Sequence, residues 1–302
     1  MSGEIRIGIV GLDTSHVVAF TQLLNDSDHE YHIPGGRVTM AYPGGSPDFE
    51  LSISRVEGYK KTLQQDYGVQ IVDSITEVAK HTDAILLESV DGRVHLEQFR
   101  QLAPFQKPVF IDKPLATTYK EACEICEMAS QYNVPLMSSS ALRFAQGLTN
   151  VLKEKSKGNV IGADCYGPMT LEPTQPGLFW YGIHSVEMLF AVLGHSCVKV
   201  QAIANQDHDL VIGEWEDGRI GTVRGNRMGN RQFGAMIHFE QGSQWVDISA
   251  DVKPYYASLL EKIMQMFTSR NPIIEIKETL QIIRFIEAAN QSRQSRFPVV
   301  LS

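Results

Sequence analysis

Short apolar runs alternate with amphipathic segments along the first 140 residues, and this alternation constrains the fold more than any other feature. The run Ile5–Val10 ends just before Gly11 and is typical of a strand buried on both faces. In His16–Asn25, which follows, apolar residues recur at helical spacing. Further strands are expected at 37–42, 70–72, 84–87, 109–111 and 135–138, and further helices at 55–67, 75–80, 95–102 and 119–132. The alternation predicts right-handed βαβ units and a parallel sheet covered by helices on both faces.

The pattern changes beyond about residue 140. Short alternating runs separated by Gly, Asp and Asn are typical of antiparallel strands. Such runs are found at 199–204, 210–215, 220–224, 235–239 and 244–249, with an edge-like run at 298–301 and helices expected at 142–155, 183–193, 255–268 and 277–290. The sequence therefore predicts an α/β domain over residues 1–140 and an α+β domain over 141–302, with the C-terminal helix packing back toward the first domain.

Composition narrows the class of protein. The chain is 43% hydrophobic and 21% charged, and its formal net charge is −8. A net negative charge disfavours nucleic-acid binding and leaves no polybasic patch for an anionic membrane. We find no apolar stretch long enough to span a membrane and no signal-peptide pattern at the first residues, so we expect a cytoplasmic protein.

Cys123 and Cys126 form a Cys-x-x-Cys pair, which can indicate a redox motif or half of a zinc site. Both lie in a run with helical spacing, and no second pair follows at metal-ligand spacing. We therefore interpret them as small residues packed on a helix. From the sequence we expect no disulfide and no metal site.

Ligands of parallel sheets bind outside the carboxyl ends of the strands, so the segments 11–16, 42–48, 88–95 and 112–115 are the candidates. The first of them stands where a dinucleotide-binding Gly-x-Gly-x-x-Gly loop would lie. Only Gly11 fits that fingerprint, because Asp13 stands at the second glycine and His16 at the third. A carboxylate at Asp13 is expected to compete with a phosphate for the helix N-terminus. Alternatively Asp13, Thr14 or Ser15 caps the helix, and the two hydroxyls can still donate to a phosphate.

The segment Asp112–Lys113–Pro114 directly follows a strand that is expected to be buried. It places Lys113 at the carboxyl edge of the sheet, and proline makes the turn rigid. A lysine in apolar surroundings can shift its pKa toward neutrality and exchange protons. The alternative is a surface lysine in an ordinary turn.

Asp112–Leu115 resembles the Glu-Lys-Pro signature of the glucose–fructose oxidoreductase / inositol dehydrogenase / rhizopine-catabolism (Gfo/Idh/MocA) family. Further patches are similar to that family in layout: 83–86 followed by His95, 141–144 with Arg143, 182–187 with His184, and the closing helix with 298–301. The resemblance implies a Rossmann-type domain and a second domain with an open-faced, mainly antiparallel sheet. Because an uncovered apolar sheet face must be buried, we expect a homodimer or homotetramer packed through strands of residues 199–249.

The resemblance also implies an NAD- or NADP-dependent oxidoreductase that acts on a hydroxyl of a sugar, cyclitol or similar polyol. Lys113 and His184 would be catalytic, with His184 accepting the hydroxyl proton. Residues expected to contact the cofactor are Gly8, Gly11, Asp13, Thr14, Ser15, His16, Glu88, His95 and Lys113, and those expected to contact the substrate are Arg143, Trp180 and Tyr181.

Three departures from the family pattern favour a different class of function. Asp13 and His16 interrupt the phosphate loop, and Trp180 stands where the family commonly has an aspartate one helical turn before its histidine. The alternative is therefore a non-catalytic member of the same fold that senses a metabolite or regulates a partner.

Overall fold

The computed structural model describes residues 3–301, and its contacts divide the chain into two compact units. The first unit comprises the described residues up to Ala116 together with Lys120–Ser139 and Tyr256–Ile276. The second comprises Thr117–Tyr119, Ser140–Tyr255 and the described residues from Lys277 onward. Helix α8 (Tyr255–Ser269) thus belongs almost entirely to the first unit and the last helix, α9 (Ile276–Ser295), to the second. That the last helix packs back toward the first domain stays a prediction.

The first unit is built on a parallel sheet of the predicted kind. Its strands are β1 (Ile5–Val10), β2 (Gly36–Tyr42), β3 (Gln70–Ile71), β4 (Ala84–Leu87), β5 (Val109–Ile111) and β6 (Leu136–Ser138). They lie in the order β3-β2-β1-β4-β5-β6, and every neighbouring pair is parallel. All residues of β4, β5 and β6 are buried, as expected for strands covered on both faces.

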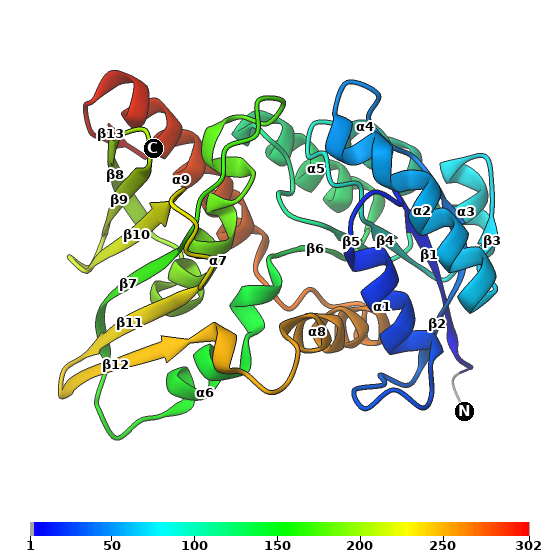
Figure 1. The fold of residues 1–302 in the computed structure, drawn as a ribbon, viewed down its shortest axis with the longest axis horizontal. Helices are drawn as coiled ribbons and strands as arrows, with labels where there is room; N and C mark the ends of the chain where they lie inside the picture. Colours follow the sequence, from blue (N-terminus) through cyan, green and yellow to red (C-terminus); the bar gives the residue numbers. More distant parts are fainter. Residues whose placement is uncertain (1–2, 302) are drawn as a thin grey trace. The chain divides into compact units, whose positions relative to one another are not determined.

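Helices connect these strands, as Figure 1 shows in blue to green. They are α1 (His16–Asn25), α2 (Glu50–Tyr67), α3 (Ile75–His81), α4 (His95–Leu102) with the short η1 (Ala103–Phe105), and α5 (Tyr119–Tyr132). Helix α2 begins five residues before the predicted start. Helix α8 joins this unit from far along the sequence: the side chain of Met264 lies against Gly36, so a Cβ at Gly36 would stand 2.6 Å from the Met264 methyl carbon.

The second unit contains a seven-stranded sheet in the order β12-β11-β7-β10-β9-β8-β13. Its strands are β7 (Val160–Pro168), β8 (Cys197–Ala204), β9 (His208–Trp215), β10 (Ile220–Asn226), β11 (Gly234–Phe239), β12 (Gly242–Asp247) and β13 (Val299–Val300). All neighbouring pairs are antiparallel except β7 with β10, so the sheet is mainly antiparallel, as predicted. Its helices are η2 (Ala141–Phe144), α6 (Gln146–Lys153), η3 (Gly177–Phe179), α7 (Gly182–Leu193), η4 (Ile248–Ala250) and α9.

Strand β7 is absent from the sequence-based prediction. Gly162, Asp164 and Gly167 interrupt its apolar alternation, so the run reads as a loop. Packing requires a glycine at position 167, because a Cβ there would stand 2.3 Å from the Phe233 ring. The strand is stabilised by its place in the middle of the sheet rather than by the propensity of its residues.

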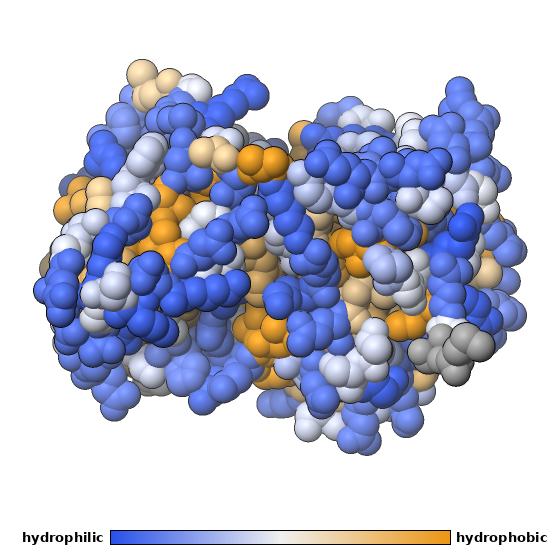
Figure 2. Space-filling view, turned by 90° about the horizontal axis from the view of Figure 1, so that it is seen from below, coloured by the Kyte–Doolittle hydropathy of each residue, from blue (hydrophilic) through white to orange (hydrophobic). Residues whose placement is uncertain are grey.

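The two faces of this sheet differ in what covers them. Val211 and Val223 lie on one face and are fully buried, and α7 packs on β7 and β10. The other face carries apolar side chains that remain exposed, among them Ile203 (60%), Ile220 (55%) and Trp245 (55%). Figure 2 shows one face of the molecule, on which hydrophilic residues predominate and apolar areas are small and separate. None of the described helices has the length and hydropathy needed to span a bilayer.

A buried arginine joins three segments of the second unit. Arg143 of η2 donates from Nε to Glu187 of α7 at 2.7 Å, and its Nη2 lies 2.6 Å from a carboxylate oxygen of Glu278 in α9. Arg143 and Glu187 are both buried. Burial raises the pKa of Glu187, which the positive charge of Arg143 opposes.

We expect Arg143→Ala to lower the free energy of unfolding by about 3–5 kcal/mol, because it leaves two carboxylates without their counter-charge. The matched control is Arg6→Ala in the first unit, where Arg6 pairs with Asp83 in solvent (side chains 57% and 44% exposed). Urea denaturation measures both losses, and a loss for Arg143→Ala as small as that for Arg6→Ala would contradict this assignment.

The exposed apolar residues on the open sheet face predict self-association through strands within residues 199–249, since large apolar patches are rare on monomers. Light scattering at micromolar concentration should give at least twice the monomer mass of 33.7 kDa. Trp245→Lys should shift the protein toward the monomer, whereas Ile53→Lys, at an exposed isoleucine of α2 (40%), should not. A monomer mass for the unaltered protein would refute the prediction.

Candidate functional site

The parallel order of the first sheet brings the ends of β1, β4 and β5 to one edge, because these strands are neighbours. Gly11 follows β1, Glu88 follows β4 and Asp112 follows β5. All three residues are buried. This edge is the candidate site within the first unit.

The loop after β1 turns tightly at Gly11, whose φ is +91°. A Cβ at this position would stand 2.5 Å from the backbone nitrogen of Ser89, so only glycine fits. The loop is tied to the end of β2 by hydrogen bonds from Gly11 N to Tyr42 O and from Leu12 N to Pro43 O. Gly8, by contrast, lies inside β1, where a Cβ would meet Val78 of α3 at 2.3 Å. This gives Gly8 a role in helix–strand packing, and contact of Gly8 with a cofactor stays a prediction.

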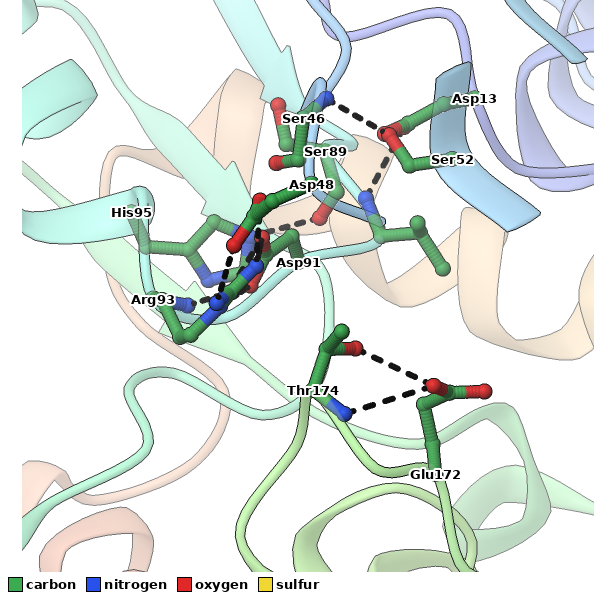
Figure 3. Close-up of polar contacts among 11 residues, drawn as sticks. Asp13, Ser46, Asp48, Ser52, Ser89, Asp91, Arg93, His95, Glu172 and Thr174 are labelled. Atoms are coloured by element: carbon green, nitrogen blue, oxygen red, sulfur yellow. Dashed lines mark hydrogen bonds and ion pairs between the residues drawn. The ribbon is translucent and has the colours of Figure 1, made fainter. Parts of the chain in front are cut away.

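Asp13 links three segments of this edge, as Figure 3 shows. Its Oδ2 accepts from the Ser52 hydroxyl at 2.5 Å and its Oδ1 accepts from Val90 N at 2.9 Å. The Ser52 oxygen in turn accepts from Ser46 N. The side chain is completely buried, and burial raises the pKa of Asp13 against these hydrogen bonds. Both carboxylate oxygens are engaged, so the expected competition with a phosphate at the helix terminus loses its basis.

The start of α1 fits the phosphate of a dinucleotide. Ser15 is the N-cap residue and is exposed, and no side chain caps the helix. The first turn of α1 contains no acidic residue. Backbone N–H groups at a helix start, with the Thr14 and Ser15 hydroxyls, are donors suited to an anion. The capping alternative is not what the structure shows. The Ser15 side chain accepts no hydrogen bond from a backbone N–H of the first turn, and the Asp13 carboxylate accepts from Ser52 and Val90 instead.

His16 lies between two buried carboxylates. Its Nδ1 is 3.4 Å from Glu88 Oε2 and 3.3 Å from Asp112 Oδ2. The exposed fractions are 7% for His16, 0% for Glu88 and 1% for Asp112. The ring also packs against Tyr256 of α8 and Phe20 of α1, with centroids 4.7 and 5.5 Å away.

The charges of this cluster shift one another's pKa values. Burial lowers the pKa of His16, but the carboxylates of Asp112 and Glu88 outweigh it and raise that pKa to about 9. Burial raises the pKa of Glu88, which His16 opposes. Burial also disfavours the Asp112 carboxylate, yet His16 and Lys113 together lower its pKa to about 2. With no other ligand present, an imidazolium between carboxylates is the favoured state.

Lys113 follows Asp112 in the turn after β5. Its backbone N–H donates to Asp112 Oδ1 at 2.8 Å, and the residue is only 7% exposed. The alternative of an ordinary surface lysine is thus wrong. The positive charge of Lys113 contributes to lowering the pKa of both Glu88 and Asp112.

His95 begins α4 and is fully buried. Its Nε2 lies 2.7 Å from Ser89 O and its Nδ1 lies 2.9 Å from Pro114 O. The ring therefore bridges the loops that follow β4 and β5, and Figure 3 shows it beside Ser89 of the first of them. This geometry gives His95 a structural role, and contact with a cofactor stays a prediction.

The second unit holds the other predicted catalytic residue, His184, in the first turn of α7. Its Nδ1 lies 2.7 Å from the Ser140 hydroxyl, which also accepts from Leu142 N at 3.3 Å. Tyr181 and Phe233 flank the ring at 5.5 and 5.6 Å. Sequence spacing gave no signal for Ser140, because it lies 44 positions away.

The predicted substrate residues of this unit have different surroundings. Trp180 is 9% exposed and its ring centroid lies 6.2 Å from that of Tyr181, which is half-buried. The guanidinium of Arg143 pairs with Glu187 and Glu278, so its structural role is clear. Contact of these residues with a substrate stays a prediction, as does a ligand shared by Lys113 and His184.

Residues 5–140 match an oxidoreductase family with an NAD-binding Rossmann fold. An uncharacterised oxidoreductase of Streptococcus pneumoniae is 23% identical over 124 residues, which cover 40% of this chain and 34% of that relative. The chain thus matches about a third of the length of this curated relative.

Solved structures share the fold over nearly the whole chain. The myo-inositol dehydrogenase of Lactobacillus casei, in complex with NAD(H) and myo-inositol, is 14% identical with a TM-score of 0.78, covering 99% of this chain and 97% of that one. The myo-inositol 2-dehydrogenase of Lactobacillus plantarum is 15% identical with a TM-score of 0.80, covering 99% and 100%. Residues 5–140 thus match the Gfo/Idh/MocA oxidoreductase family with its NAD-binding Rossmann fold, the family that the Asp112–Leu115 turn resembles.

Proposed function

We propose that the protein is an NAD- or NADP-dependent oxidoreductase that acts on a hydroxyl of a sugar, cyclitol or similar polyol in the cytoplasm. The observation that carries the proposal is the buried Lys113, held by the turn after β5 at the same sheet edge as the phosphate-type loop after β1. Family membership of residues 5–140 supports the cofactor, and the polyol class rests on what the structural relatives bind.

The cofactor's pyrophosphate would lie at the loop between Gly11 and α1. Thr14 and Ser15 supply hydroxyl and backbone donors there, and Asp13 is turned away into its own hydrogen bonds. A nicotinamide, when bound, exchanges a hydride with the carbon that bears the reacting hydroxyl.

Lys113 would donate a hydrogen bond to the oxygen of the reacting hydroxyl, and His184 would accept the proton of that hydroxyl. Lys113 is buried and close enough to the Glu88 carboxyl to affect its pKa, and its side chain would serve as the hydrogen-bond donor. His184 would take the hydroxyl proton on Nε2, since Nδ1 faces Ser140. Tyr181, in contact with the His184 ring, and Trp180 beside it would line the substrate.

A specific observation favours a second candidate, a metabolite-sensing or regulatory protein without turnover. His16 stands where the fingerprint has its third glycine, and its imidazole is held between buried carboxylates. Titration with NAD and NADP, followed by a polyol panel monitored through absorbance of the reduced nicotinamide, separates the two. Nucleotide binding with turnover supports the oxidoreductase, and absence of turnover with every polyol supports the sensor.

We expect Asp13→Gly to weaken nucleotide binding rather than tighten it. The substitution removes both acceptors that hold Val90 N and Ser52, and so loosens the loops on which the phosphate site rests. Asp13→Asn keeps an acceptor for Val90 N and is the matched control, with binding near that of the unaltered protein. Calorimetric titration with NAD and NADP measures both variants. Tighter binding by Asp13→Gly would instead support competition between the Asp13 carboxylate and the phosphate.

We expect Lys113→Met to abolish turnover and His184→Asn to lower kcat by at least about 10²-fold, the cost typical of a lost general base. Matched controls are Lys60→Met on α2 and His195→Asn beyond α7, which should retain the rate. Melting temperatures test whether each variant is folded. Full activity in a folded Lys113→Met variant would remove Lys113 from the mechanism.

A further inference from the structure

We propose that His16, Glu88 and Asp112 form a binding site for one divalent transition-metal ion, of which Zn²⁺ is the best match. The three residues converge from the ends of β1, β4 and β5 within the first unit. The proposal does not depend on the proposed function, because the site is complete within these three side chains.

The spacing of the donor atoms fits a metal better than direct hydrogen bonds. Nδ1 of His16 lies 3.4 Å from Glu88 Oε2 and 3.3 Å from Asp112 Oδ2. A charge-assisted N–H···O bond is shorter, about 2.7–2.9 Å. Metal–ligand bonds of about 2.0–2.1 Å at tetrahedral angles place ligand atoms roughly 3.3–3.4 Å apart. One ligand atom from each residue lies within 4.8 Å of the other two.

The donor atoms of this cluster are buried and lack other partners. Among the residues that the structure describes, none makes a hydrogen bond to His16 Nδ1, to either oxygen of Glu88 or to Asp112 Oδ2. Buried polar atoms are nearly always paired, and a bound ion is one recognised reason for an exception. Four such atoms that face one another are the independent sign of a ligand among them.

The donor set also selects the kind of ion. One imidazole nitrogen and two carboxylates suit zinc and related ions, whereas Ca²⁺ and Mg²⁺ prefer oxygen ligands alone. Three protein ligands leave the fourth tetrahedral position for water or a ligand oxygen. Charge is balanced as well, since M²⁺ with a neutral imidazole and two carboxylates sums to zero.

Neighbouring groups hold the proposed ligands in place. Asp112 receives the Lys113 N–H on Oδ1, which leaves Oδ2 for the ion. The His16 ring is held between Tyr256 and Phe20. Contacts of this kind orient metal ligands in known sites.

The experiment is a calorimetric titration of chelator-treated, nucleotide-free protein with Zn²⁺ and, separately, with Mn²⁺. We expect one ion per chain, with Zn²⁺ bound more tightly than Mn²⁺. Glu88→Gln should weaken Zn²⁺ binding by at least about tenfold. This variant should fold, because it removes a charge that burial disfavours. His81→Gln and Glu77→Gln, on exposed residues of α3, are matched controls and should bind like the unaltered protein.

A second readout requires no substitution. The ring ¹⁵N resonances of His16 should shift on addition of one equivalent of Zn²⁺. Lack of stoichiometric binding, an unchanged affinity in folded Glu88→Gln, or unshifted His16 resonances would each overturn the proposal. Nucleotide binding is measured apart from the metal, so failure here leaves the oxidoreductase proposal intact, and the reverse also holds.

Discussion

The buried charges at the carboxyl edge of the parallel sheet must balance one another, and much of the candidate site depends on that balance. Because β1, β4 and β5 are neighbours, His16, Glu88 and Asp112 are enclosed together where water cannot solvate them. Asp112 is also the acceptor that fixes the turn of Lys113. A change in the charge of His16 would therefore reach Lys113 through one carboxylate. The turn that holds Lys113 and the neutralisation of the carboxylates by His16 are two parts of one electrostatic arrangement.

Asp13, which replaces a glycine of the dinucleotide fingerprint, has a structural role that comparison with the fingerprint alone does not reveal. A glycine at position 13 would leave Val90 N and the Ser52 hydroxyl without their present acceptor. Asp13 supplies both acceptors, and these hydrogen bonds offset the cost of burying its carboxylate. The loop is thus held by side-chain hydrogen bonds to neighbouring segments, while the helix terminus stays clear for an anion. A substitution that looks like a lost phosphate site is compatible with a retained one.

Sequence periodicity was sufficient for much of the fold. It predicts β1 and α1 to the residue and the order of elements in the first unit, because buried parallel strands are locally apolar. It misses β7, whose Gly162, Asp164 and Gly167 are explained only by neighbours in the sheet and by Phe233. It also does not reveal the convergence of His16 with two carboxylates, since their strands are adjacent in space and distant in sequence. The rule that ligands bind at carboxyl ends of strands pointed to the loops in which these three residues lie, but not to the contacts among them.

His184 illustrates how a missing residue can be replaced from another segment. An aspartate at position 180 would accept Nδ1–H and stabilise the imidazolium, and Trp180 cannot. Ser140 faces Nδ1 instead, and its oxygen already accepts from Leu142 N. A hydroxyl either donates or accepts, so it permits both tautomers of the ring. In the proposed oxidoreductase, the tautomer with Nδ1–H is the one whose Nε2 would take a proton from a substrate hydroxyl. A neutral hydroxyl stabilises an imidazolium less than a carboxylate would, so Ser140 replaces the missing aspartate only in part.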